Sequence, residues 1–203
     1  MLLRGRLPTA LAALVALGAV DSAPLGAQAR GVTVFVYGGT YRALRDLNEV
    51  GTDRFGTRRT LGGGVGYEVD RNVELRATLT EAASQFVESG VAYDKYLNRY
   101  YLAGEAMYKH PFAGGVMPYG FVGFGAVRLH ETGTRSTADK IQGFADVGVG
   151  VAYRVRKSGW SLFVQGVGFF YSLTGMTTPT FTRFNRAQLD AAWTAGVAYR
   201  VAL

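Results

Sequence analysis

Apolar and polar residues alternate along eight separate stretches of the chain. Because successive side chains in a β-strand point to opposite faces, such alternation predicts strands with one apolar and one polar face. Each stretch is long enough for a tilted strand to cross a bilayer, which takes roughly 9–11 residues. The predicted strands are Val32–Arg42, Arg58–Asp70, Asn72–Ser84, Tyr96–Lys109, Pro118–His130, Ile141–Val155, Trp160–Tyr171 and Ala187–Leu203.

The last stretch shows the division most clearly. Its polar face carries Gln188, Asp190, Thr194 and Arg200, and its apolar face carries Leu189, Trp193, Val197, Tyr199, Val201 and Leu203. A transmembrane barrel turns apolar residues toward lipid and polar residues toward its lumen. The pattern therefore predicts an all-β fold, an eight-stranded antiparallel up-and-down transmembrane β-barrel.

Six of the eight stretches sort into two faces in this way. The stretches Val32–Arg42 and Pro118–His130 do not, because apolar bulk occupies both of their faces. A β-bulge in either would change which residues point inward, so the sequence does not decide which residues of these two strands face the lumen.

The connections between these stretches alternate in length. Short ones at Asp70–Asn72, His110–Met117 and Arg156–Gly159 separate longer polar ones at Ala43–Thr57, Gln85–Lys95, Glu131–Lys140 and Ser172–Arg186. Bacterial barrels place short turns in the periplasm and long loops outside. We therefore expect both termini on the periplasmic side.

The first 29 residues read as a signal peptide. They combine a basic start, an apolar run from Leu11 to Val20 and the small-x-small sequence Ala27-Gln28-Ala29, so we expect cleavage after Ala29. The apolar run is too short for a membrane-spanning helix, which needs roughly 20 residues. Residues 30–203 then form a single barrel domain. The chain contains no Cys, which excludes disulfides and attachment as a lipoprotein.

The C-terminus resembles the assembly signal of bacterial outer-membrane barrels, a polar residue, a Gly and two apolar residues at fixed spacing. The matching residues are Thr194, Gly196, Tyr199 and Val201, followed by Leu203 where such proteins often end in Phe. Over essentially the whole mature sequence, the chain resembles the small eight-stranded outer-membrane barrels of OmpA/OmpX type. The resemblance implies a monomeric integral protein of the Gram-negative outer membrane. It also implies periplasmic chaperones and the barrel-assembly machinery as partners.

The inward face of the predicted barrel carries many charges. They are Glu68, Glu74, Arg76, Arg99, Glu105, Lys109, Asp146, Arg154, Asp190 and Arg200. The interior of an eight-stranded barrel is just wide enough for side chains to fill it, and buried charges persist only when paired. Matched heights on neighbouring strands predict two pairs, Arg76 with Glu105 and Arg128 with Asp146. A structural plug of ion pairs, in which Glu68, Glu74 and Arg200 also take part, is favoured over a gated ion or proton path.

The formal net charge is +7, with basic residues gathered at the predicted outer rim. Export makes nucleic acid an implausible partner. Lipopolysaccharide phosphates would lie at the height of the rim, where Arg forms bidentate contacts well. The candidate phosphate contacts are Arg58, Arg59, Arg135, Lys140, Arg183 and Arg186, and a merely solvated loop surface explains them equally well.

Catalytic chemistry has one weak candidate. His130 is predicted at the outer end of a strand, with Glu131, Thr132, Thr134 and Ser136 close in sequence. No G-x-S-x-G motif is present, so a rim histidine that forms ordinary hydrogen bonds is favoured. The sequence has no Cys and no His pair for a metal, and its Gly-x-Gly sequences do not complete a nucleotide fingerprint, so no cofactor is predicted.

These observations favour a structural or surface-interaction role through the outer loops. A lipid-modifying enzyme built around His130 and a narrow channel for ions or small solutes are the alternatives.

Overall fold

The computed structural model describes residues 31–45, 54–88, 91–133, 139–155, 158–177 and 183–203. Within these ranges the chain forms nine strands and no helix, so no helix there could cross a membrane. The predicted signal peptide lies outside the described residues. The strands are β1 (Gly31–Ala43), β2 (Arg54–Phe55), β3 (Arg58–Glu68), β4 (Val73–Glu88), β5 (Val91–Lys109), β6 (Val116–Gly133), β7 (Asp139–Arg154), β8 (Trp160–Thr177) and β9 (Arg183–Ala202).

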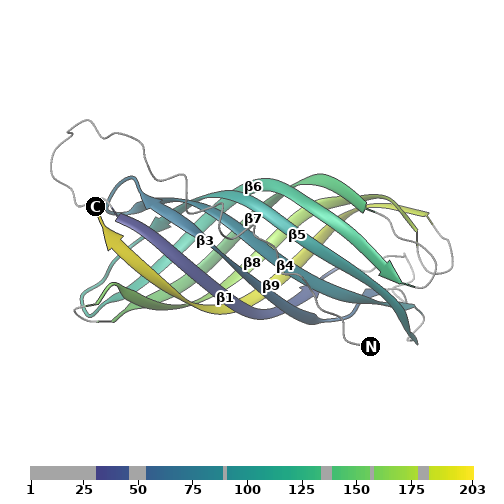
Figure 1. The fold of residues 1–203 in the computed structure, drawn as a ribbon, viewed down its shortest axis with the longest axis horizontal. Coiled ribbons are helices and arrows are strands. Elements are labelled where there is room, and N and C mark those ends of the chain that lie inside the picture. The colour runs from purple at the N-terminus through teal and green to yellow at the C-terminus, as the bar shows by residue number, and fades with distance from the viewer. Residues whose placement is uncertain (1–30, 46–53, 89–90, 134–138, 156–157, 178–182) are drawn as a thin grey trace, which may run out of the picture.

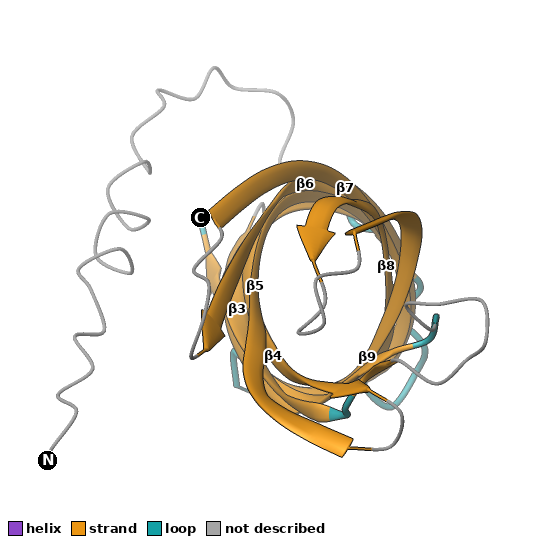
Figure 2. Cartoon of the chain, turned by 90° about the vertical axis from the view of Figure 1, so that its right-hand side faces the viewer, coloured by secondary structure: helices purple, strands orange, loops and turns teal. Residues whose placement is uncertain are grey.

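Eight of these strands close into a ring. Each of the eight pairs antiparallel with the strands before and after it in the chain. The short strand β2 is not part of the ring, so β1 pairs with β3. The last strand returns to the first, with Gly31 opposite Ala202 and Ala43 opposite Asp190. Figure 1 shows the strands strongly tilted, and Figure 2 shows the closed ring from one end. The predicted eight-stranded antiparallel barrel is confirmed, and closure leaves no open edge between β1 and β9.

The strands run further than predicted at the end away from the C-terminus (Figure 1). β4 reaches Glu88, β5 begins at Val91, β8 reaches Thr177 and β9 begins at Arg183. Most of the predicted loops Gln85–Lys95 and Ser172–Arg186 is therefore strand. Beyond a bilayer both faces of a hairpin can be polar, so backbone pairing continues where alternation has ended. The short strand β2 also lies in a predicted loop and pairs with Phe86 and Val87 of β4.

The structure settles the two strands whose facing the sequence left open. In β1, Phe35, Tyr37 and Tyr41 are buried inside the barrel while Val34 and Val36 are exposed. In β6 the buried set is Tyr119, Phe121, Val127 and Leu129, and the exposed set includes Val122 and Phe124. The lumen therefore contains aromatic and aliphatic bulk as well as charge, which is why polarity alone did not separate these faces.

Glycines on the inward face of β3 and β7 make room for this bulk. A Cβ on Gly62 would lie 2.5 Å from the ring of Tyr37, and one on Gly150 would lie 2.5 Å from the ring of Tyr119. Only a residue without a side chain fits beneath these rings. The Gly-rich segment of β3 is thus explained by packing.

Candidate functional site

Polar side chains, most of them buried, gather in the lumen in two clusters. One lies near the short turns and comprises Glu68, Glu74, Arg76, Thr78, Glu105, Lys109 and Arg200; we call it the turn-end cluster. The other lies near the long connections and comprises Tyr41, Ser84, Arg99, Tyr101, Tyr171, Gln188 and Asp190; we call it the loop-end cluster.

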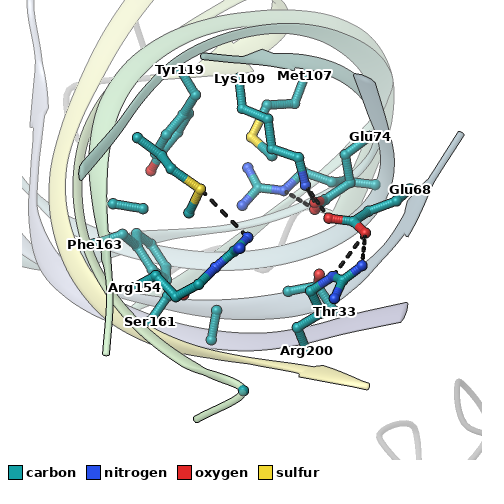
Figure 3. A pocket seen from close by; sticks show the side chains of 15 residues that line it. Thr33, Glu68, Glu74, Met107, Lys109, Tyr119, Arg154, Ser161, Phe163 and Arg200 are labelled. Carbon is teal, nitrogen blue, oxygen red and sulfur yellow. Dashed lines mark hydrogen bonds and ion pairs between the residues drawn. The ribbon is translucent and has the colours of Figure 1, made fainter. Parts of the chain in front are cut away.

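Glu68 is the centre of the turn-end cluster. Lys109 Nζ lies 2.5 Å from Glu68 Oε1 and 2.9 Å from Glu74 Oε2. Arg200 approaches the other oxygen of Glu68, with Nη2 at 2.6 Å and Nε at 2.8 Å. Three strands, β3, β5 and β9, are therefore joined through one carboxylate, as Figure 3 shows.

Arg76 links this group to the middle of the lumen. It lies directly opposite Glu105 in the β4–β5 register, with Nη1 3.7 Å from Glu105 Oε2, and its Nε is 3.4 Å from Glu74 Oε1. The Thr78 hydroxyl donates to Glu105 Oε1 at 2.7 Å. The guanidinium also lies over the Phe35 ring, 4.4 Å from its centroid. The structure thus brings together the two residues that the sequence placed at equal height.

The predicted pair between Arg128 and Asp146 is wrong. Val127 and Leu129 point into the barrel, so Arg128 between them points out, where it donates to Asp139 at 2.9 and 2.5 Å. Asp146 is 4% exposed in the lumen and lies opposite Gly123, five positions from Arg128 along β6. Within the described chain, Asp146 Oδ1 has no hydrogen-bond partner.

The loop-end cluster surrounds a charged pair that sequence reasoning did not connect. Arg99 and Asp190 are fully buried, with Arg99 Nε 3.6 Å from Asp190 Oδ2. Asp190 Oδ2 accepts hydrogen bonds from the Tyr171 hydroxyl at 2.5 Å, from that of Tyr101 at 3.4 Å and from that of Tyr41.

Further hydrogen bonds hold this pair in place. Arg99 donates to Ser84 and, at 2.8 Å, to the Tyr171 hydroxyl, while Gln188 donates to Asp190 Oδ1 at 2.8 Å. Their strands, β5 and β9, lie four steps apart in either direction around the eight-strand ring. The pair therefore spans the barrel from wall to wall, and comparing heights on neighbouring strands could not reveal it. Tyrosines at inward positions of three strands were the available signal.

The rim candidates are only partly described. Arg58 and Arg59 are exposed at the start of β3, and Arg58 donates to Gln85 Oε1 at 2.5 Å and lies over the Tyr96 ring at 5.9 Å. Lys140 lies on β7, opposite Leu129. Arg135 and the side chains of Arg183 and Arg186 lie outside the described residues. Among the candidates whose side chains are described, Arg58 and Arg59 are consecutive on β3 and both exposed.

His130 has little around it for catalysis. Its side chain is 30% exposed and its Nδ1 is 3.6 Å from Asp139 Oδ2, on a carboxylate that Arg128 already occupies. Nδ1 makes no hydrogen bond within the described chain, and Glu131 points into the lumen. Thr134 and Ser136 lie outside the described residues. Among the residues that are described, no group of three or more His, Cys, Asp or Glu could hold a metal ion.

The outer surface is a broad apolar belt. Leu61, Leu102, Val149 and Phe124 are among the large apolar side chains that are more than half exposed, and Trp160 and Tyr199 pack together at 5.0 Å near one edge. Soluble proteins rarely expose so much contiguous apolar surface, whereas a membrane barrel requires it. Of the proposed assembly-signal residues, Thr194 is buried and Tyr199, Val201 and Leu203 belong to this belt. A Cβ on Gly196 would lie 2.5 Å from the Phe163 ring.

Comparison with known proteins is consistent with a barrel whose apolar surface faces lipid. The family model of the outer membrane protein beta-barrel domain matches residues 9–201. No curated protein sequence gives a match.

Three solved structures with the same fold are Neisserial surface protein A, AlkL in lipid bilayers and OprG from Pseudomonas aeruginosa. Neisserial surface protein A has 14% identity and a TM-score of 0.57, with 86% of this chain and 99% of that one covered. AlkL has 19% identity and a TM-score of 0.51, with 91% of this chain and 98% of that one covered. OprG has 12% identity and a TM-score of 0.52, with 85% of this chain and 96% of that one covered. The chain therefore belongs to the outer membrane protein beta-barrel domain family and is an integral β-barrel of the outer membrane.

Proposed function

We propose that this protein is a non-conducting barrel that works through its outward-facing surface. The observation that carries the proposal is the loop-end cluster, in which Arg99 and Asp190 meet across the full width of the lumen. The bridge joins opposite walls, and the buried rings of Tyr41, Tyr101 and Tyr171 fill the lumen around it, so no continuous path for water remains at that height.

The packing around the bridge supports a plug. The Tyr101 ring stacks on Phe169 at 4.4 Å and meets Phe144 edge-on at 5.0 Å, while Leu97, Val127, Leu129 and Leu173 are fully buried at similar heights. Buried charges persist when they are paired and hydrogen-bonded, as these are. A gated path would require this whole layer to separate.

With the lumen closed, the parts of the protein that can meet a partner are its ends and its lipid-facing belt. The strands that continue into the predicted loops enlarge the loop end. Arg58 and Arg59 are exposed there, and guanidinium groups bind phosphate in a bidentate manner. We propose lipopolysaccharide phosphates as the contact of these two side chains.

Conductance tests the plug. Purified protein in planar bilayers should give no single-channel steps, whereas a Tyr41→Ala, Tyr101→Ala, Tyr171→Ala triple variant should give them, because its lumen loses three rings. Flotation of both proteins with liposomes, measured beforehand, shows that the wild type also inserts. Regular unitary steps from the wild-type protein would overturn the proposal in favour of a channel.

Lipopolysaccharide co-purification tests the rim contacts. An Arg58→Gln, Arg59→Gln variant should retain less lipopolysaccharide through a high-salt wash than the wild type, because two guanidinium contacts are lost. Arg42→Gln, an exposed cation on the neighbouring strand β1, is the control and should retain as much as the wild type. Equal retention by all three proteins would contradict the proposed phosphate contacts and favour a rim that is merely solvated.

A further inference from the structure

The turn end of the lumen contains a cavity of about 60 Å³ that the plug does not fill. A water molecule needs roughly 10–15 Å³ on this measure, so the space holds several waters or one small solute. Gly159 and Ser161, beside a short turn, line it, so it is expected to open toward the periplasm. We call it the turn-end pocket, and Figure 3 shows its side chains.

The lining of the pocket is unbalanced in charge. It includes four cationic side chains, Arg76, Lys109, Arg154 and Arg200, but only two carboxylates, Glu68 and Glu74. Glu105 lies beyond the pocket and faces Arg76. Counting it still leaves one positive charge in excess.

Arg154 carries that excess charge. Lys109, Arg200 and Arg76 occupy the oxygens of Glu68 and Glu74. Among the described residues, the only hydrogen-bonding contact of the Arg154 guanidinium is to the Met117 sulfur, 3.6 Å from Nη2. Figure 3 shows the Arg154 side chain extending into the pocket.

A thioether is a weak acceptor, and a guanidinium has five N–H donors in a planar fork. Such a fork matches the two oxygens of a carboxylate or phosphate group. The hydroxyl-bearing side chains Thr33 and Ser161 also line the pocket and offer further donors.

We propose that the turn-end pocket binds a small oxyanion, a carboxylate or phosphate group, through Arg154. The proposed binding goes beyond the surface role and does not depend on it, whereas the side from which the anion enters rests on the proposed closed lumen. With the loop-end cluster beyond it, the pocket is a blind recess, so the anion binds from the periplasmic side and does not cross the barrel.

Methionine methyl NMR tests binding directly, because Met107 and Met117 line the pocket while Met176 lies at the opposite end of β8. The chain, labelled with ¹³C at the methionine methyls, is purified from outer membranes into phosphate-free alkyl maltoside micelles. It is then titrated with inorganic phosphate or acetate, against sodium chloride at equal ionic strength. We expect a saturable shift that is largest for Met117, smaller for Met107 and absent for Met176.

Two variants assign the site. Arg154→Gln removes the proposed contact without stranding a buried partner, and it should weaken binding by about tenfold or more, the effect of one charge-assisted hydrogen bond. Arg59→Gln, an exposed cation at the other end of the barrel, should bind as the wild type does. No saturable shift in the wild type, an equal shift with chloride, or unchanged binding in Arg154→Gln would overturn the proposal.

Phospholipid nanodiscs distinguish the two sources of phosphate. A Met117 signal already displaced in phosphate-free nanodiscs, relative to micelles, would assign the site to a lipid headgroup. A signal that moves only when inorganic phosphate is added would assign it to a soluble ligand. An unmoved signal in both media would contradict binding of either.

Discussion

Single residues show where strand parity suffices and where it fails. Arg76 and Glu105 lie on adjacent strands, so parity and height were enough to place them opposite each other. Arg128 lies on β6, where aromatic and aliphatic residues fill the lumen, so its parity could not be read from polarity. Arg99 and Asp190 meet across the barrel, a relation set by the ring of strands and by side-chain length.

The contact between Arg76 and Glu105 predicts thermodynamic coupling. Removing one member of a buried pair strands the other charge, at a cost of roughly 3–5 kcal/mol, whereas removing both can be nearly neutral. Arg76→Met with Glu105→Gln should therefore destabilise the barrel by less than the sum of the single variants. Reversible urea unfolding in liposomes, followed by tryptophan fluorescence, measures this cycle, and additive effects would mean that the pair contributes no coupling.

The same Asp→Asn substitution should change the unfolding free energy differently at the two buried aspartates. Asp190 neutralises Arg99 and accepts from three tyrosines, so Asp190→Asn should cost roughly 3–5 kcal/mol of unfolding free energy. Asp146 Oδ1 has no partner among the described residues, so Asp146→Asn removes a buried charge that little compensates and should be neutral or stabilising. The same unfolding assay compares them, and an Asp146→Asn variant as unstable as Asp190→Asn would refute this distinction.

At the scale of elements, the sequence indicated the membrane-crossing part of each strand but not the ends. The apolar belt imposes alternation only where one face meets lipid, so Val147, Val149 and Val151 marked the centre of β7 clearly. Outside that zone, pairing between backbone groups extends β4, β5, β8 and β9 without a side-chain pattern. β2 is two residues long and has no periodicity to detect.

The last strand makes a specific prediction about assembly. β9 pairs with both β1 and β8, and its final residues contribute Tyr199, Val201 and Leu203 to the apolar belt. Deleting Tyr199–Leu203 should therefore leave the barrel unclosed and yield periplasmic aggregates or degradation products in place of a heat-modifiable band. A matched variant, Arg200→Gln, keeps the strand and should still assemble. Normal heat-modifiable protein after the deletion would show that these residues are not an assembly signal.

For the whole molecule, the fold followed from the sequence because every level agreed: eight alternating stretches, alternating connection lengths and a terminal strand that closes the ring. The lumen depended instead on tertiary contacts between distant strands. The turn-end pocket could not be predicted at all, since its lining comes from β1 and β3 through β9.

Accessibility of a cysteine inside the barrel tests the closed lumen most directly, because the chain has no native Cys. Ala152 is buried in the turn-end pocket, Ser158 is exposed at a short turn, and Gly56 lies at the loop end with room for a side chain. Each is replaced by Cys singly, and sealed proteoliposomes are treated with a small membrane-impermeant thiol reagent.

In each liposome a barrel has either its turn end or its loop end outside. Ala152→Cys and Ser158→Cys should therefore be protected to the same extent, in the barrels whose turn end faces inward. Gly56→Cys should be labelled in those same barrels. Adding the Tyr41, Tyr101 and Tyr171 alanine substitutions should abolish protection, because the reagent then passes through the lumen. Complete labelling of Ala152→Cys with the tyrosines in place would contradict a barrel closed by the loop-end cluster.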